Sequence, residues 1–118
     1  RTVHLGLAGF GTVGGAVFRN LRANADLLAR RCGVRVEFAA VAAQSLARRP
    51  RDAAGAAAAR LRARDLDALV ADPRVELIVE LIGGCGAARR LILSSLRAGK
   101  PVVTANKALL AEHGREIF

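Results

Sequence analysis

A glycine-rich run near the start of the sequence has the spacing of a loop that binds phosphate groups. It follows an apolar run, Val3–Ala8, that is typical of a strand, and it precedes apolar residues at helical spacing. The N-terminus of a helix offers free backbone N–H groups and a favourable dipole to an anion. The glycines would allow a tight turn, close approach of the backbone to phosphates, and close packing of helix on strand. The pattern predicts the pyrophosphate site of a dinucleotide, with a merely flexible turn as the weaker alternative. Its residues are Gly9, Phe10, Gly11, Thr12, Val13 and Gly14.

The end of the second expected strand indicates which dinucleotide this site prefers. Sites that prefer NAD commonly place an acidic side chain there, which accepts a hydrogen bond from the ribose 2′-hydroxyl. This sequence has no acid between Phe38 and Arg51, and Gln44, Arg48 and Arg49 are the candidate contacts. Guanidinium groups pair well with a 2′-phosphate, so the sequence favours NADP over NAD, or use of both cofactors. A surface loop whose arginines contact nothing is an equal alternative.

Two later motifs lie where further strands are expected to end. Residues 80–84 follow the clearest apolar strand, and residues 104–111 follow the next one. Ligands of open α/β sheets bind outside the carboxyl ends of the strands, so both motifs should share one cleft with the glycine loop. Lys107 would bring a cation there that polarises a carbonyl or holds a carboxylate. Glu80 is interpreted as a hydrogen-bond anchor at a strand end in preference to a substrate ligand.

Alternating apolar segments supply the elements that must position these loops. We expect strands over residues 3–8, 34–43, 75–82 and 101–104. We expect helices over residues 13–28, within 46–64, and over 65–72, 86–98 and 106–113. Gly33 should close the first helical stretch, and Asn106 should cap the last helix. This alternation predicts an α/β fold, a Rossmann-type doubly wound parallel sheet.

The composition fits a packed aliphatic domain with a charged surface. Hydrophobic residues make up 53% of the chain, and Trp, Tyr and Met are absent, which favours helices on a parallel sheet over an aromatic-rich β-sandwich. The formal charge is +9, but the arginines are spread along the chain without interleaved aromatic residues. A solvated surface is therefore favoured over a nucleic-acid partner. No apolar run is long enough to span a membrane, and no signal peptide is recognisable.

Three motifs together make the chain similar to the homoserine dehydrogenase family. They are Gly-Phe-Gly-Thr-Val-Gly-Gly at 9–15, Val-Glu-Leu-Ile-Gly-Gly at 79–84, and Val-Val-Thr-Ala-Asn-Lys-Ala-Leu-Leu-Ala at 102–111. The last motif is the most specific, because it is long and unusual for a generic Rossmann domain. The resemblance implies reversible reduction of L-aspartate 4-semialdehyde to L-homoserine with NADPH or NADH, in threonine and methionine biosynthesis. It also implies that the full-length enzyme is a homodimer.

The same resemblance implies roles for individual residues. Gly83 and Gly84 resemble the turn that passes the nicotinamide-side ribose. Thr104 and Lys107 resemble the strand-end groups that face the nicotinamide and the substrate, which makes Lys107 the candidate catalytic residue. The residues that resemble the family's pyrophosphate loop are Phe10, Gly11, Thr12 and Val13.

Some positions depart from the family pattern or carry no expected chemistry. Gln44 and Ser45 stand where members commonly have an Arg-Asp type pair. Cys85 is interpreted as a packed small residue, because hydride transfer to an aldehyde needs no covalent thiol. Cys85 and Cys32 form no CxxC pair, which predicts free thiols, no metal site and a cytoplasmic protein. Both histidines, His4 and His113, are interpreted as structural.

Residues 1–118 are expected to form one NAD(P)-binding domain of a longer enzyme. The chain stops at Phe118, in or just after a helix and without a capping signal, so we expect a substrate domain beyond it. In that case, residues 1–118 alone would bind the cofactor without turnover. Two alternatives stay open, namely an NAD(P)H-sensing regulatory module and a dehydrogenase for another small aldehyde or hydroxy acid.

Overall fold

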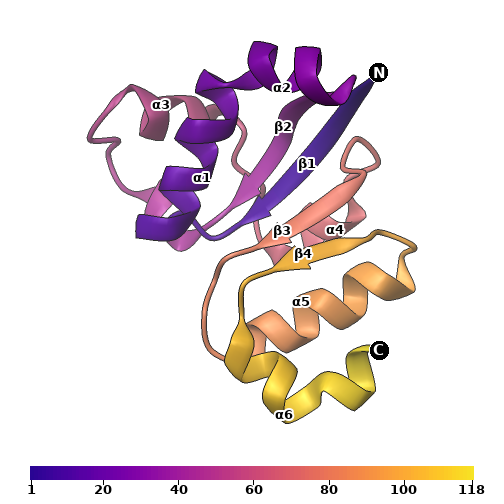
Figure 1. Cartoon of the computed structure of the whole chain (residues 1–118). Coiled ribbons are helices and arrows are strands. Elements are labelled where there is room, and N and C mark those ends of the chain that lie inside the picture. Colours follow the sequence, from indigo (N-terminus) through magenta and orange to yellow (C-terminus); the bar gives the residue numbers. More distant parts are fainter.

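Strands and helices alternate along the chain, as Figure 1 shows for the computed structural model of residues 1–118. Each expected element is present, with differences in some of the bounds. The strands are β1 (Thr2–Ala8), β2 (Arg35–Ala42), β3 (Leu77–Glu80) and β4 (Val102–Thr104). The helices are α1 (Thr12–Ala23), α2 (Ala25–Cys32), the 3₁₀ helix η1 (Gln44–Ala47), α3 (Ala53–Arg60), α4 (Leu66–Ala71), α5 (Gly86–Arg97) and α6 (Lys107–Ile117).

The strands form one parallel sheet in the spatial order β2-β1-β3-β4. β1 pairs with β2 on one side and with β3 on the other, and β4 lies at the edge beside β3. Parallel neighbours need crossover connections, which the intervening helices supply. The expected Rossmann-type arrangement is therefore confirmed, and the loops after the strands open at one common edge of the sheet.

Helices cover both faces of this sheet, with α1 and α3 on one face and α4 and α5 on the other (Figure 1). Along β1, successive side chains enter different apolar clusters. Leu5 and Leu7 pack in a cluster with Phe18 of α1, whereas Ala8 packs in a cluster with Leu69 of α4. The strands read as almost continuous apolar runs because both of their faces are buried. Burying Phe18 completely contributes about 2–3 kcal/mol to folding.

The expected first helix, over residues 13–28, is two helices that meet at Asn24. Asn24 has φ −106° and ψ 15°, and its side-chain Nδ2 donates to the carbonyl oxygen of Asn20 at 2.9 Å. This side-chain bond shares its acceptor with the backbone N–H of Asn24, and the ψ of Asn24 departs from the helical value, so the chain changes direction between α1 and α2. Gly33 closes α2 in the left-handed conformation, as predicted.

β3 is shorter than the expected strand over 75–82, because its ladder partners pair with it only between Leu77 and Glu80. Val75 lies before the strand but is only 2% exposed, so its apolar character serves core packing. Beyond the other end, Leu81 N–H still donates to the carbonyl oxygen of Ala8 at 2.9 Å. The loop after β3 is therefore tied to the end of β1.

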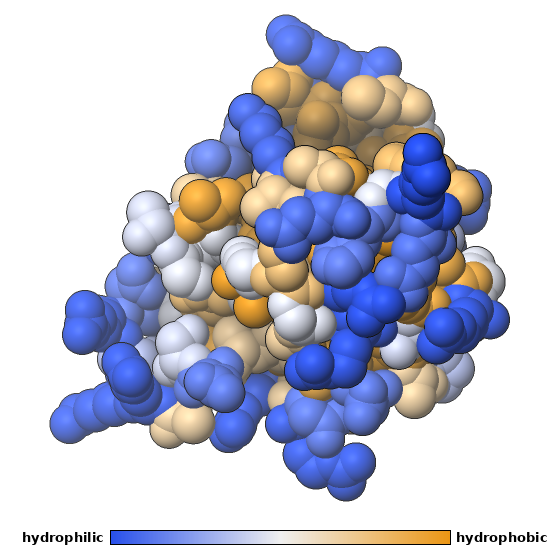
Figure 2. Space-filling view, turned by 90° about the horizontal axis from the view of Figure 1, so that it is seen from below, coloured by the Kyte–Doolittle hydropathy of each residue, from blue (hydrophilic) through white to orange (hydrophobic).

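Charged side chains cover much of the surface. Figure 2 shows hydrophilic groups spread over the lower face, with apolar areas between them. This distribution agrees with the expected solvated surface. No helix combines the length and the apolar character that crossing a bilayer requires.

Candidate functional site

The glycine loop between β1 and α1 is packed so closely that side chains would not fit at two of its positions. Gly9 has φ +102°, and a Cβ there would lie 2.6 Å from the carbonyl oxygen of Leu81. A Cβ on Gly14 would lie 2.3 Å from the carbonyl oxygen of Gly9. The absence of side chains thus lets the loop turn tightly against the end of β3 and lets α1 pack on the loop.

The N-terminus of α1 is open to solvent and carries no negative charge. Gly11 precedes the helix without a side-chain cap, and no acidic residue lies in the first turn. The N–H of Gly15 donates to the carbonyl oxygen of Gly11 at 2.9 Å, so the N–H groups before Gly15 have no acceptor within the helix. A Cβ on Gly11 would meet no atom within 4 Å, and Thr12 and Val13 are exposed. This cradle of backbone donors fits a pyrophosphate.

Phe10 fastens the glycine loop to the hydrophobic core. Its ring packs edge-on against Phe18 with a centroid distance of 5.5 Å, and the ring of Phe18 lies 4.8 Å from that of Phe38. The hydroxyl of Ser45 donates a long hydrogen bond of 3.5 Å to the carbonyl oxygen of Phe10. The aromatic core between α1 and β2 therefore helps to set the position of the loop.

A cleft of about 600 Å³ opens beside the loop at the ends of β1 and β2. Gln44, a predicted cofactor contact, lines it, and the end of β2 contributes Ala42 and Ala43 but no carboxylate. Asp65 is the only acid in its lining. The carboxylate of Asp65 accepts a hydrogen bond of 2.7 Å from Ala68 N–H, which caps α4 and holds the pKa of Asp65 below its usual value.

The sequence patterns did not indicate that Arg62 and Arg64 line the same cleft. The segment that carries them adds to the outer edge of β2. Val41 N–H donates to Leu61 at 2.9 Å, and Ala63 N–H donates to Val41 at 2.7 Å, in both cases to a carbonyl oxygen. Such an isolated bridge has no periodicity of its own, so local sequence patterns give no signal for it.

A smaller hollow of about 280 Å³ lies on the α1 side of the loop and is hereafter called the arginine hollow. Arg48 and Arg49 line it, in agreement with the expectation that they lie near the end of β2. Arg51, which follows them in the sequence, also lines it, and so does Arg19 from α1, which was not expected there. Asp52 is its only acid, and the Asp52 carboxylate lies 3.8 Å from the Arg19 guanidinium. The lining therefore has a positive net charge.

A further hollow of about 260 Å³ lies where the three predicted loops meet, hereafter the loop hollow. Lys107 lines it as the exposed first residue of α6. Gly83 and Gly84 form the turn beside it, with φ of 81° and 70°, a left-handed conformation that favours glycine. The expected meeting of the three loops is confirmed. The lining residues are Val13, Glu80, Leu81, Gly83, Ala105, Asn106 and Lys107.

Glu80 is completely buried at the end of β3. Its carboxylate accepts hydrogen bonds from the N–H of Ile82 at 2.8 Å and from the hydroxyl of Thr104 at 2.5 Å. Thr104, which directly precedes the lining residues Ala105 and Asn106, therefore directs its hydroxyl proton toward Glu80. Both oxygens of Glu80 are engaged within the protein, which agrees with its interpretation as a strand-end anchor.

The cysteines and histidines form no catalytic arrangement. Burial raises the pKa of the half-buried Cys85 thiol, and the nearby carboxylate of Glu112 raises it further, so the nucleophilic thiolate is disfavoured. His4 Nδ1 lies 3.1 Å from a carboxylate oxygen of Glu76 at the opposite end of the sheet. No group of three or more His, Cys, Asp or Glu side chains is placed to hold a metal ion.

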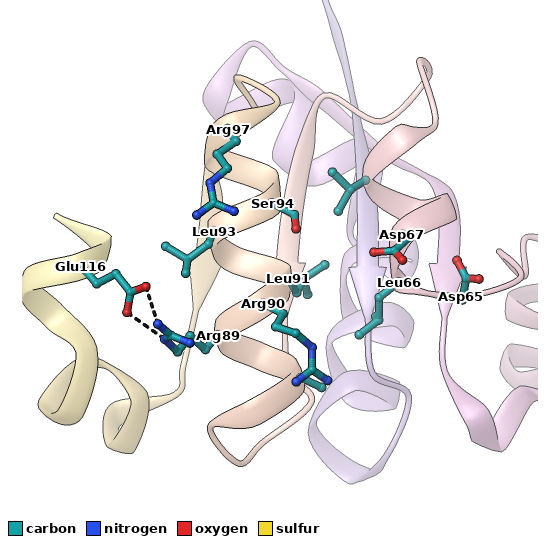
Figure 3. Close-up of a pocket in the computed structure, with 12 residues that line it drawn as sticks. Asp65, Leu66, Asp67, Arg89, Arg90, Leu91, Leu93, Ser94, Arg97 and Glu116 are labelled. Carbon is teal, nitrogen blue, oxygen red and sulfur yellow. Dashed lines mark hydrogen bonds and ion pairs between the residues drawn. The ribbon is translucent and has the colours of Figure 1, made fainter.

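A groove of about 590 Å³ between α4 and α5 adjoins the cleft, with which it shares lining residues such as Asp65. Figure 3 shows Arg89 of α5 joined by two hydrogen bonds to Glu116 of α6 across one end of this groove. This pairing lowers the pKa of Glu116. No buried side-chain polar atom of the groove lacks a partner.

The fold and the glycine loop together define a class of protein. A doubly wound parallel sheet, an open helix N-terminus after its first strand, and a cleft at the carboxyl ends of the strands characterise a Rossmann-type dinucleotide-binding domain.

Comparison with known proteins identifies the family. A family model described as "Homoserine dehydrogenase, NAD binding domain" matches residues 9–118. The homoserine dehydrogenase of Pseudomonas aeruginosa is 44% identical over 118 residues, which are all of this chain and 26% of that protein. That of Neisseria gonorrhoeae is 41% identical over the same length, again 26% of the relative. The chain belongs to the NAD-binding domain family of homoserine dehydrogenases and spans about a quarter of the length of these relatives.

Solved structures agree with this assignment. A homoserine dehydrogenase from Thiobacillus denitrificans superposes on the whole chain with a TM-score of 0.83 and 41% sequence identity, over 26% of its own length. A homoserine dehydrogenase from S. aureus gives a TM-score of 0.86 over 98% of this chain and 28% of its own, at 23% identity, which supports the fold alone.

Proposed function

We propose that this chain is the cofactor-binding part of an oxidoreductase that interconverts L-aspartate 4-semialdehyde and L-homoserine, and that it binds NADP(H) in preference to NAD(H). The observation that carries the proposal is the open, uncharged N-terminus of α1 beside the arginine hollow. The first feature suits the pyrophosphate, and the second suits a phosphate on the ribose. Membership of the family supports the reaction, which belongs to threonine and methionine biosynthesis.

The glycine loop, the cleft and the loop hollow would divide the binding of a dinucleotide between them. The backbone of residues 9–14 would hold the pyrophosphate, with the Thr12 hydroxyl as an extra donor. The adenosine half would lie in the cleft that Gln44 lines, and the nicotinamide half would lie in the loop hollow beside Gly83 and Gly84. The cofactor supplies the hydride chemistry, while the protein binds and orients it.

Preference for NADP(H) rests on the charge at the end of β2. The end of β2 itself contributes no carboxylate that could accept from a 2′-hydroxyl. Arg48 and Arg49 line the arginine hollow together with Arg19, and Asp52 is the single acid among its lining residues. Guanidinium groups donate paired hydrogen bonds to phosphate oxygens, so a 2′-phosphate would gain contacts that a hydroxyl does not.

Lys107 is the proposed catalytic residue of the full-length enzyme. Its exposed side chain stands at the start of α6, on the rim of the loop hollow. There its ammonium group would stabilise negative charge that develops on the substrate oxygen, or deliver the proton. The substrate-binding part and the homodimer contacts would come from the portion of the relatives that this chain does not span.

Titration of the 118-residue chain with NADPH and with NADH tests the cofactor proposal. We expect saturable binding of both, with NADPH the tighter ligand. Replacing Arg48 and Arg49 together with alanine should reduce this preference by about tenfold or more, because charge-assisted hydrogen bonds are lost. The matched control replaces Arg30 and Arg31, exposed at the end of α2, which removes the same charge and should change neither affinity. Tighter binding of NADH by the unaltered chain would reject the NADP preference.

Assays of the full-length enzyme with homoserine, NADP and NAD test the reaction. The 118-residue chain alone should bind the cofactor without turnover. Lys107→Ala in the full-length enzyme should lower kcat by about a hundredfold or more while changing cofactor affinity little, since it removes an interaction at the reacting atoms. Unchanged turnover would exclude the role of Lys107.

A further inference from the structure

The buried carboxylate of Glu80 joins two loops that are far apart in the sequence. Its donors are Ile82 N–H at 2.8 Å, in the loop after β3, and the hydroxyl of Thr104 at 2.5 Å, at the end of β4. Burying a carboxylate is costly unless donors compensate it. Glu80 is fully buried, so its two hydrogen bonds hold these loops together at the rim of the loop hollow.

The contacts of Thr104 leave it with only one way to meet a ligand. Its single hydroxyl proton is donated to Glu80, and its oxygen accepts a hydrogen bond of 3.0 Å from the N–H of Asn106. A hydroxyl has one proton and two lone pairs. The hydroxyl of Thr104 can therefore accept one more hydrogen bond, but it has no proton left to donate.

Asn106 continues the network to the turn after β3 and to α6. Its Oδ1 accepts from Leu109 N–H at 3.0 Å and so caps α6, and its Nδ2 donates to the carbonyl oxygen of Gly84. Lys107 is the next residue in the chain and the first of the helix. The same side chain thus fixes both the Gly83–Gly84 turn and the start of the helix that carries Lys107.

We propose that Glu80 is a positioning residue for the nicotinamide half of the cofactor, acting through Thr104 and Asn106. The network holds the loop hollow in one arrangement before a ligand arrives and presents Thr104 as a hydrogen-bond acceptor. The matching ligand group is a primary amide, here the carboxamide of the nicotinamide ring, whose N–H can donate to the Thr104 hydroxyl oxygen. This inference rests on the proposed function and assigns the orientation of the carboxamide within it.

Two isosteric variants of the 118-residue chain test the proposal. Glu80→Gln introduces an NH₂ group that donates to Thr104, which occupies its last lone pair and turns its proton outward. Thr104→Val removes the hydroxyl at nearly constant volume. We expect either change to weaken the binding of NADPH about tenfold. The affinity for 2′-phospho-ADP-ribose, which lacks the nicotinamide, should stay within about twofold of that of the unaltered chain. The fluorescence of bound reduced nicotinamide should also change in both variants.

Two further variants separate positioning from general destabilisation. Thr104→Ser keeps the hydroxyl and should restore NADPH binding to within about threefold of the unaltered chain. Ser95→Ala removes another buried hydroxyl, which donates to the carbonyl oxygen of Leu91 at 2.7 Å, and should alter stability without altering NADPH binding. Thermal unfolding of each variant reports how much of the chain is folded.

The possible results distinguish this inference from the function on which it rests. If the unaltered chain binds neither NADPH nor 2′-phospho-ADP-ribose, the proposed function fails and the inference fails with it. Alternatively, the unaltered chain binds both ligands, while Glu80→Gln and Thr104→Val lower the two affinities equally or lower neither. In that case only the positioning role is rejected. Failure of Thr104→Ser to restore binding would likewise reject the role of the hydroxyl.

Discussion

Gly11 and Gly14 lie in the same loop, yet they meet different surroundings. Gly14 is buried against the backbone of Gly9, so a side chain there would collide with a carbonyl group. Gly11 faces open space and has φ −79°, which other residues adopt readily. Packing requires a glycine at position 14. Position 11 faces open space, and that space would belong to the ligand.

We therefore expect alanine at the two positions to have separable effects. Gly14→Ala should lower the free energy of unfolding by about 1–3 kcal/mol, because the loop must move to admit the Cβ. Gly11→Ala should unfold at nearly the temperature of the unaltered chain but bind NADPH at least about tenfold more weakly, because the methyl group projects into the phosphate cradle. Thermal unfolding and calorimetric titration measure both effects. Tight NADPH binding by a folded Gly11→Ala variant would contradict the assignment of the cradle.

Among the elements, α3 connects helix stability to the charge of the arginine hollow. Its N-cap is Asp52, whose carboxylate accepts a hydrogen bond of 2.7 Å from Gly55 N–H. The same carboxylate lies 3.8 Å from the Arg19 guanidinium and lines the arginine hollow. Asp52 therefore stabilises the helix while it opposes the binding of an anion beside it.

Two replacements of Asp52 should distinguish these effects. Asp52→Ala removes the cap and should cost about 1 kcal/mol of stability, whereas Asp52→Asn retains a capping oxygen and should cost less. Both remove a negative charge, so both should raise affinity for NADPH relative to NADH by roughly two- to fivefold at low salt. Unfolding curves and titrations at two salt concentrations check this. Equal destabilisation by the two replacements would mean that capping is not the dominant contribution.

At the scale of the whole molecule, the 118-residue chain has the dimensions of a packed domain. Its radius of gyration is 13.9 Å, close to the value of about 13.5 Å for a compact chain of this length. Ion pairs on the surface join elements across it, including Arg89 with Glu116 between α5 and α6. Within the turn between α4 and β3, the guanidinium of Arg74 lies 2.7 Å from the carboxylate of Asp72 and lowers its pKa.

These pairs predict how stability depends on pH. The pKa values of Glu116 and Asp72 are lower in the folded chain than in the unfolded chain. The stability that each carboxylate adds is present above its unfolded pKa and is lost as pH falls through its folded pKa. The unfolding temperature should therefore stay nearly constant down to about pH 5 and fall below about pH 4. Glu116→Gln should make that fall shallower, and an unfolding temperature that does not decline in acid would contradict the pairing.

Much of this architecture is predictable from local patterns. The apolar runs indicate the strands because both faces of a parallel sheet are buried, and Asn106 and Gly33 mark helix ends through their own backbone preferences. The break at Asn24 was not predicted, because an asparagine can face solvent from within a helix as easily as end one. The predicted length of β3 was also wrong, because Val75 is apolar for packing in the core and lies outside the paired strand.

The sequence alone determined the glycine loop, the alternation of strands and helices, and the strand-end motifs, because each is encoded by residues that are neighbours in the chain. Only the tertiary structure brought Arg19, Arg62 and Arg64 to the site, through contacts between separate segments. It also decided the part played by Glu80, whose carboxylate meets a donor from another strand. Such contacts follow from the order of strands in the sheet and from the packing of helices upon it, which no local periodicity records.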